Sequence, residues 1–168
     1  MSFSLGSKSL ANLDRVHPDL VKIILRAIQL STQDFGVTEP QVRTLEYQKT
    51  LVARGVSKTL KSNHLEQVDL TGRTGLLMGH ATDLVPWNGT AFVWDWDKIY
   101  PIVVAMAQAA DELKLRQQLC WGGVWDRWMS EYDCSSPAHA RQAEATYCVR
   151  HPGKDFVDGP HFQLYKKG

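Results

Sequence analysis

The sequence predicts an α+β fold in which a small, mostly antiparallel sheet packs with helices. Helical patterns come first along the chain, strand-like runs follow, and one long helical pattern lies among the strands. The 168 residues are enough for one domain with a proper core. Because no repeat, low-complexity tract or linker interrupts them, we expect residues 1–168 to form a single domain.

Three helices are predicted from apolar periodicity and from start and stop signals. The first begins at Pro18 and Asp19, and its apolar face consists of Leu20, Ile23, Ile24, Ala27 and Ile28. Residues 42–55 are typical of a strand end that runs into a helix, which Gly55 ends. A long helix follows Asp97, and its apolar positions are Ile99, Val103, Met106, Ala110 and Leu113.

Three runs are predicted as strands, namely residues 80–87 (HATDLVPW), 118–123 (QLCWGG) and 161–165 (HFQLY). Residues 129–155 are harder to interpret. Their stretch from Ala138 to Val149 is compatible with a helix but is bracketed by proline and glycine. We interpret it as a helical excursion between two strands.

The composition excludes several classes of partner. The chain is 43% hydrophobic and 22% charged with a net charge of +1, so no strong field favours nucleic acid or an anionic membrane. No segment approaches 18 apolar residues, and the first residues lack the apolar core of a signal peptide. We therefore expect synthesis in the cytosol without stable membrane association, and outside help for any destination beyond a membrane.

The cysteine count is odd, with Cys120, Cys134 and Cys148 and no CxxC pair. This argues against a disulfide framework and against a thiolate zinc site. A bridge between Cys134 and Cys148 stays open in an oxidising compartment, whereas free thiols are the favoured interpretation.

Tryptophan is abundant, with six residues. Four of them flank the motifs described below: Trp87, Trp94, Trp96 and Trp121. They are open to two interpretations, as core residues or as residues that face a ligand.

A candidate zinc site is formed by histidine and carboxylate residues. Zinc enzymes that hydrolyse amides use three protein ligands, commonly histidine and carboxylate, and keep one position open for water. The candidates are His64 in SNHL, Asp83 in GHATDLVPW and His161 in DGPHFQL. Asp83 lies in a strand-like run, where a carboxylate is costly unless it is paired or bound to metal. His161 follows a rigid Asp-Gly-Pro turn and is either a ligand or a structural histidine at a strand start.

The other histidines are weaker candidates. His80 comes three residues before Asp83, so the two side chains point to opposite faces of a strand. His17, His139 and His151 lie in helix-start or loop settings, and we interpret them as surface residues. The absence of an HExxH motif excludes a zincin helix.

Several separate motifs in the same order resemble those of a zinc peptidase superfamily. They are SKTLKSNHL followed by GHATDLVPW, then WGG, then FVDGPHFQL. Together they resemble the D-alanyl-D-alanine carboxypeptidase, VanX/VanY and Hedgehog-like superfamily, and within it the bacteriophage endolysins that act as L-alanyl-D-glutamate peptidases. That family shows S-x-H-x-x-G-x-A-x-D and D-x-P-H-F-E, and VRTLEYQ is similar to its R-T-x-x-x-Q helix start. The resemblance spans roughly residues 17–165.

The resemblance implies a Hedgehog/DD-peptidase-like fold and a role for each matching residue. His64, Asp83 and His161 would bind Zn2+, and Asp158 would be the catalytic base. In such a site zinc acidifies its water, and Asp158 takes the proton and returns it to the leaving amine. Arg43 matches the arginine near the scissile carbonyl, where it would steady the oxyanion. The alternative for Arg43 is a surface cation at a helix start.

The chain departs from the family pattern at three places. Eighteen residues separate His64 from Asp83, and residues 66–77 (EQVDLTGRTGLL) are interpreted as an insertion, which leaves His64 the least secure ligand. Asn63 stands where the family usually has arginine or lysine. Gln163 replaces the usual glutamate, and because glutamine carries no charge, metal affinity or pH optimum could shift.

The expected function is that of a phage endolysin that cleaves the L-Ala–D-Glu bond of peptidoglycan stem peptides. We expect a monomer without a separate cell-wall-binding domain, which suits a thin Gram-negative wall. It would accumulate in the host cytoplasm and depend on a holin to reach the wall in the periplasm.

Two alternatives stay open. One is a D-alanyl-D-alanine carboxypeptidase or dipeptidase, which cuts another bond of the same substrate. The other is a zinc-containing wall-binding module that has lost catalysis. The intact Asp158 and DGPH turn argue against this module, whereas the insertion argues for it.

Overall fold

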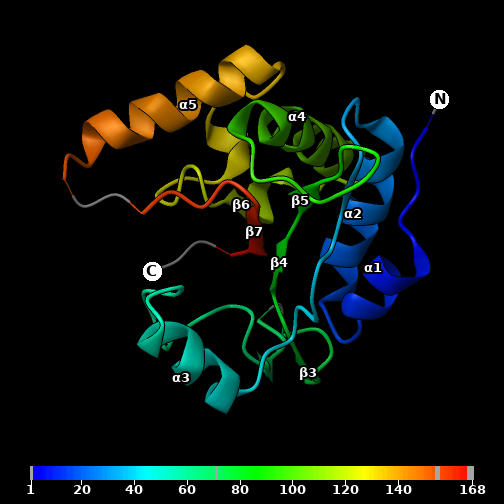
Figure 1. The fold of residues 1–168 in the computed structure, drawn as a ribbon, viewed down its shortest axis with the longest axis vertical. Helices are drawn as coiled ribbons and strands as arrows, with labels where there is room; N and C mark the ends of the chain where they lie inside the picture. The colour runs from blue at the N-terminus through cyan, green and yellow to red at the C-terminus, as the bar shows by residue number, and fades with distance from the viewer. Residues whose placement is uncertain (1, 71, 154–155, 166–168) are drawn as a thin grey trace.

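The structure, a computed structural model, describes residues 2–70, 72–153 and 156–165 (Figure 1). Its helices are α1 (Ser7–Asn12), α2 (Pro18–Leu30), α3 (Leu45–Ala53), α4 (Trp96–Glu112) and α5 (Pro137–Arg150), with short 3-10 helices η1 (Arg116–Gln118) and η2 (Met129–Glu131). Its strands are β1 (Phe35–Gly36), β2 (Gln67–Val68), β3 (Leu77–Met78), β4 (Ala81–Asp83), β5 (Val85–Pro86), β6 (Leu119–Trp121) and β7 (His161–Leu164).

The main sheet has three antiparallel strands in the order β4-β7-β6. Two further antiparallel pairs, β1 with β5 and β2 with β3, flank it. The C-terminal strand β7 is therefore central, although it comes last in the chain. This mixture of helices with small antiparallel sheets confirms the predicted α+β class.

The core lies between α2, α4 and the main sheet. Pro18 opens α2, and the Nδ1 atom of His17 accepts a hydrogen bond from the backbone N–H of Asp19 at 3.1 Å. All five apolar residues predicted for this helix are buried. Asp95 caps α4 in the same way, through Asp97 N–H at 3.0 Å. The fully buried Trp121 of β6 extends this core into the sheet.

Helix α3 confirms the prediction of a strand end that runs into a helix. Arg43 forms an isolated bridge with Leu65, and Thr44 then caps the helix by accepting from Tyr47 N–H at 3.2 Å. After the helix ends, Gly55 adopts a φ of 72°, a conformation that glycine tolerates and that stops the helix. In Figure 1, α3 lies below β7, whereas α4 and α5 lie above it.

Other elements differ in detail from the predictions. Residues 80–87 form two short strands, β4 and β5, because Leu84 between them turns its N–H to the carbonyl of Pro160 at 2.9 Å. Helix α1 was not predicted. The helical excursion is confirmed as α5, which lies between β6 and β7 in the chain, and residues 66–77 contain β2 and the first residue of β3.

Two features bear on the cellular setting. Across the ranges that the structure describes, no helix combines the length and apolar character needed to cross a membrane. Cys120, Cys134 and Cys148 all lie in those ranges, and no disulfide joins any two of them.

Candidate active site

The pairing of β4 with β7 places two of the predicted ligands opposite each other. Asp83 at the end of β4 is the register partner of His161 at the start of β7. Residues that face each other across an antiparallel pair project from the same side of the sheet. The Nδ1 atom of His161 accordingly lies 3.1 Å from Oδ1 of Asp83.

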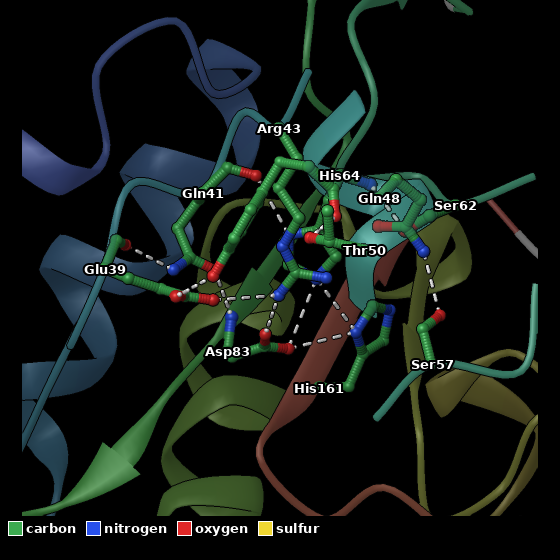
Figure 2. A network of polar contacts seen from close by, with 11 residues as sticks. Glu39, Gln41, Arg43, Gln48, Thr50, Ser57, Ser62, His64, Asp83 and His161 are labelled. Carbon is green, nitrogen blue, oxygen red and sulfur yellow. Dashed lines mark hydrogen bonds and ion pairs between the residues drawn. The ribbon is translucent and has the colours of Figure 1, made fainter. Parts of the chain in front are cut away.

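His64 reaches the same point from the loop before β2. Its carbonyl accepts a hydrogen bond from Arg43 N–H at 2.9 Å, which anchors the loop beside the start of α3. Its Nε2 atom lies 3.2 Å from Nδ1 of His161 and 3.3 Å from Oδ1 of Asp83. The structure thus brings together all three predicted ligands, and both histidines are more than nine-tenths buried (Figure 2).

The hydrogen bonds of His64 determine which ring nitrogen carries its proton. Nδ1 lies 2.9 Å from the carbonyl oxygen of Gln41, which can only accept, so Nδ1 must be the donor. A neutral imidazole carries one proton, and Nε2 therefore presents a lone pair toward Asp83 and His161.

His161 is oriented by Gln163. The amide nitrogen of Gln163 donates to the carbonyl of Tyr165 at 2.7 Å, which turns its Oε1 toward Nε2 of His161 at 3.0 Å. Nε2 therefore donates, and Nδ1 presents its lone pair to the site. In the neutral tautomers, two histidine lone pairs and a carboxylate oxygen converge on one point, and each histidine is oriented by an acceptor behind it. Such a donor set could hold a metal ion.

The three groups shift one another's pKa values. Burial lowers the pKa of His64 against the opposing charge of Asp83. Burial alone would raise the pKa of Asp83, but His64 and His161 hold it well below its usual range. Burial likewise opposes the charged form of His161, yet its hydrogen bond and charge interaction with Asp83 raise its pKa. Asp83 is therefore an anion at neutral pH, as a metal ligand must be.

Arg43 is part of the site and is not a surface cation. Its Nη2 atom donates to Oδ2 of Asp83 at 2.8 Å and lies 3.3 Å from Oε1 of Glu39 (Figure 2). Its side chain is only 11% exposed. One carboxylate oxygen of Asp83 thus meets the arginine while the other faces the two histidines.

Asp158 lines the same cleft, which has a volume of about 1690 Å³ and also contains His64, Asp83 and His161 in its walls. Its carbonyl accepts from His161 N–H at 3.1 Å, which closes the Asp-Gly-Pro-His turn. Burial, and then the charge of Asp83, raise the pKa of the Asp158 carboxyl to about 6. A carboxyl of this kind is suited to proton transfer near neutral pH.

Gly122 explains why the WGG motif accompanies this turn. Its N–H donates to the carbonyl of His161 at 2.8 Å, and its carbonyl accepts from Asp158 N–H at 2.9 Å. A Cβ atom at this position would come within 2.3 Å of the Asp158 carbonyl oxygen. Only glycine allows β6 and the turn to approach so closely.

Sequence reasoning did not identify Gln41. Its carbonyl orients His64, and its side-chain Oε1 accepts from Asp83 N–H at 2.7 Å, so one fully buried residue positions two of the three candidate ligands. No sequence signal could have found it, because both contacts are tertiary and glutamine is not a typical site residue.

His17, Asp69 and His80 form a second buried cluster, so the prediction of a surface position for His17 is wrong. Asp69, which belongs to the segment interpreted as an insertion, contacts the ring of His17. Here three of the four ring nitrogens already form hydrogen bonds. His17 accepts from a backbone N–H through Nδ1 and donates through Nε2 to Asp69 at 3.2 Å. His80 accepts from Leu70 N–H at 3.2 Å, and burial lowers its pKa to about 4. This cluster is a hydrogen-bonded unit whose donors do not fit a metal.

The fold and the first cluster define a class of protein. An α+β domain with two histidines, a carboxylate and a nearby carboxyl of raised pKa in an open cleft is typical of metal-assisted hydrolases. The family model described as "Phage L-alanyl-D-glutamate peptidase" matches residues 1–139. The chain belongs to this phage L-alanyl-D-glutamate peptidase family and is therefore a peptidase.

Two individual proteins are similar over nearly the whole chain. The L-alanyl-D-glutamate peptidase of Escherichia phage T5 is 27% identical over 168 residues, which are 98% of this chain and 99% of that protein. The crystal structure of the Serratia marcescens L-Ala D-Glu endopeptidase ChiX matches with a TM-score of 0.64 at 32% identity, over 98% of this chain and 90% of the other.

Proposed function

We propose that this chain is a zinc-dependent endolysin that hydrolyses the L-Ala–D-Glu bond of peptidoglycan stem peptides. The observation that carries the proposal is the pair of facing lone pairs, on Nε2 of His64 and Nδ1 of His161, beside the Asp83 carboxylate. Membership of the phage peptidase family supports the choice of bond.

His64, Asp83 and His161 would hold the metal. Two imidazoles and one carboxylate suit zinc and leave a coordination position open. A zinc ion held there would supply Lewis acidity and activate a water molecule for attack on the amide.

Asp158 is the proposed general base. It lies in the wall of the same cleft, and its carboxyl, with a pKa near 6, is mostly ionised at neutral pH. It accepts a proton from the attacking water and returns that proton to the amide nitrogen as the C–N bond breaks. Arg43 holds Asp83 through Oδ2, and its guanidinium lines the same cleft, where it would steady the developing oxyanion.

The biological role follows from the substrate. We propose that the chain acts as one monomeric peptidase domain, is made in the host cytoplasm and reaches the wall in the periplasm after a holin permeabilises the membrane. This proposal is supported by the chain's membership of a phage peptidase family and by its similarity to the peptidase of phage T5.

Metal analysis and product analysis together test the function. The purified protein should contain about one zinc per chain, lose activity with a chelator and regain it with added zinc. Mass spectrometry of digested peptidoglycan should show fragments that begin at D-Glu. Release of terminal D-Ala would identify the carboxypeptidase alternative, and full activity of a metal-free preparation would exclude the zinc site.

A further inference from the structure

The cleft around the site has two chemically different walls. One wall comes from the end of α3 and the loop after it and carries three exposed cations, Arg54, Lys58 and Lys61. Within the described ranges, no carboxylate forms an ion pair with any of the three. The acidic residue on this side, Glu39, is already engaged by Arg43 at 3.3 Å and by the hydroxyl of Tyr47 at 3.0 Å. This wall therefore presents net positive charge to the cleft.

The other wall is aromatic. It comes from the start of α4, the loop after β6 and the segment before β7, which lie above α3 in Figure 1. Its aromatic residues are Trp94, Trp96, Trp125 and Phe156. Trp125 packs over His161 with ring centroids 5.0 Å apart, and its Nε1 donates to the carbonyl of Phe156 at 2.7 Å. The aromatic wall thus begins directly at a candidate metal ligand.

Trp94 is the most exposed residue of this wall, although the backbone on both sides of it is anchored. Its two neighbours are anchored, since Val93 N–H donates to the carbonyl of Pro86 at 2.9 Å and Asp95 caps α4. The side chain of Trp94 is nevertheless in solvent, with the residue 71% exposed. A single exposed apolar residue is ordinary, but an indole on a rigid backbone at the rim of an active-site cleft is suited to contact a ligand.

The stem peptide is chemically asymmetric about the scissile bond. On one side L-Ala is joined directly to the lactyl group of N-acetylmuramic acid, so a sugar lies one residue away. On the other side D-Glu continues through its side-chain carboxyl, which leaves its α-carboxylate free beside the scissile nitrogen. One flank of the bond is therefore a saccharide and the other is anionic.

We propose that the two walls set the direction in which the substrate binds. The cationic wall, through Lys58 and Lys61, takes the free α-carboxylate of D-Glu, and the aromatic wall, through Trp94, takes the muramyl sugar. This inference rests on the proposed function. An ammonium group pairs with a carboxylate by charge, whereas the flat C–H face of a sugar packs on an indole without charge.

The sugar contact is tested with two substrates that share one peptide. One is L-Ala-γ-D-Glu-meso-diaminopimelate capped by an acetyl group, and the other carries the same peptide on N-acetylglucosaminyl-N-acetylmuramic acid. Trp94→Ala should lower kcat/KM about tenfold on the disaccharide substrate and leave the acetylated peptide within about twofold. Trp94→Phe should recover most of the loss, because a ring remains.

The carboxylate contact is tested by amidation. The substrate pair contains either D-Glu or D-isoglutamine, in which the α-carboxylate is an amide. Wild type should prefer the carboxylate form, and Lys58→Gln combined with Lys61→Gln should reduce that preference about tenfold. Lys49→Gln serves as the matched control, since Lys49 is an exposed lysine of α3 outside the cleft walls and should leave the preference unchanged.

The outcomes separate this inference from the proposed function. If the zinc-loaded wild type cleaves neither peptide at L-Ala–D-Glu, the proposed function is wrong. The assignment of the walls is overturned by either of two results in a wild type that cleaves the peptides. One is that Trp94→Ala lowers kcat/KM equally on the disaccharide substrate and on the acetylated peptide. The other is that the double lysine variant keeps the wild-type preference for the carboxylate form. The assignment is supported if Trp94→Ala lowers kcat/KM only on the disaccharide substrate and the double variant of Lys58 and Lys61 loses the preference for D-Glu over D-isoglutamine.

Discussion

The Nε2 atom of His64 lies 3.2 Å from the Nδ1 atom of His161, and in the neutral form of each ring neither nitrogen carries a proton. The proton of each ring is held on the opposite nitrogen, by the Gln41 carbonyl in one case and by Gln163 in the other. Two neutral rings with facing lone pairs repel each other unless a metal ion, or a proton taken up by one of the rings, lies between them. The backbone bonds to His17 and His80 use the lone pairs in the second cluster, so the two histidine clusters are predicted to differ in metal binding.

His64→Ala should therefore lose zinc and activity, whereas His80→Ala should keep about one zinc per chain and part of the activity. Both side chains are buried, so both variants lose some packing, and circular dichroism should establish that each is folded. Metal content measured on the folded proteins is the deciding observation. If His80→Ala released the metal and His64→Ala kept it, the first ligand would have to be reassigned.

Asp158 should behave as a base and not as a ligand. Asp158→Ala leaves all three candidate ligands intact, so the protein should retain zinc while turnover falls by on the order of 10²–10⁴-fold. Zinc content and kcat measured on the same preparation test this prediction. Loss of metal in the variant would place Asp158 among the ligands, and Asp158→Asn, which preserves the shape of the side chain, would then be expected to lose metal as well.

The parts of the site that sequence reasoning located are those encoded by local motifs. Asp158 and His161 lie on one rigid turn, so their proximity follows from a short-range pattern. Asp83 was located by its motif and meets His161 through the long-range pairing of β4 with β7. His64 was also located, through its SNHL motif, although eighteen residues separate it from Asp83. The structure places the antiparallel pair β2 and β3 within that separation.

The parts that sequence reasoning missed depend on tertiary packing. Gln41 acts through its carbonyl and its amide on two distant residues, which no spacing rule reveals. His17 at a helix start is typical of a surface residue, but it is buried together with His80, and Asp69 and Leu70 from the segment interpreted as an insertion contact the two rings. The substitution at Gln163 was noted for the charge it lacks, whereas the structure shows that its oxygen still accepts from His161.

Gln163 should consequently matter for metal affinity. Gln163→Ala removes the acceptor that keeps the His161 proton on Nε2, and it should weaken zinc binding about 10–100-fold while leaving kcat near wild type at saturating zinc. Gln163→Glu keeps an acceptor oxygen and should retain zinc, although a carboxylate near the Tyr165 carbonyl should lower stability. Competition titration with a chromogenic chelator measures the affinities. Equal affinity of Gln163→Ala and wild type would show that the amide has no role in orienting His161.

The last prediction concerns the attachment of α5, whose C-terminal end is held by an ion pair. Arg150 contacts both carboxylate oxygens of Asp126 at 2.9 and 3.0 Å, and His151 lies 3.2 Å from the same group. Burial alone would raise the pKa of Asp126, but the hydrogen bonds from Arg150 and His151 lower it overall. A carboxyl with a depressed folded-state pKa stabilises the fold above its unfolded pKa near 4, and this stability is lost as pH falls through the lower folded value.

Arg150→Gln should therefore lower the free energy of unfolding by about 0.5–1 kcal/mol at pH 7, a range that allows for solvent screening of a partly exposed pair. The difference from wild type should hold down to about pH 5 and shrink at lower pH as Asp126 becomes protonated. Urea denaturation across this pH series measures it. Arg127→Gln is the matched control, since Arg127 is exposed and has no ion-pair partner among the described residues. A difference between Arg150→Gln and wild type that stayed constant to pH 2 would mean that packing of the arginine, and not its charge, holds α5 in place.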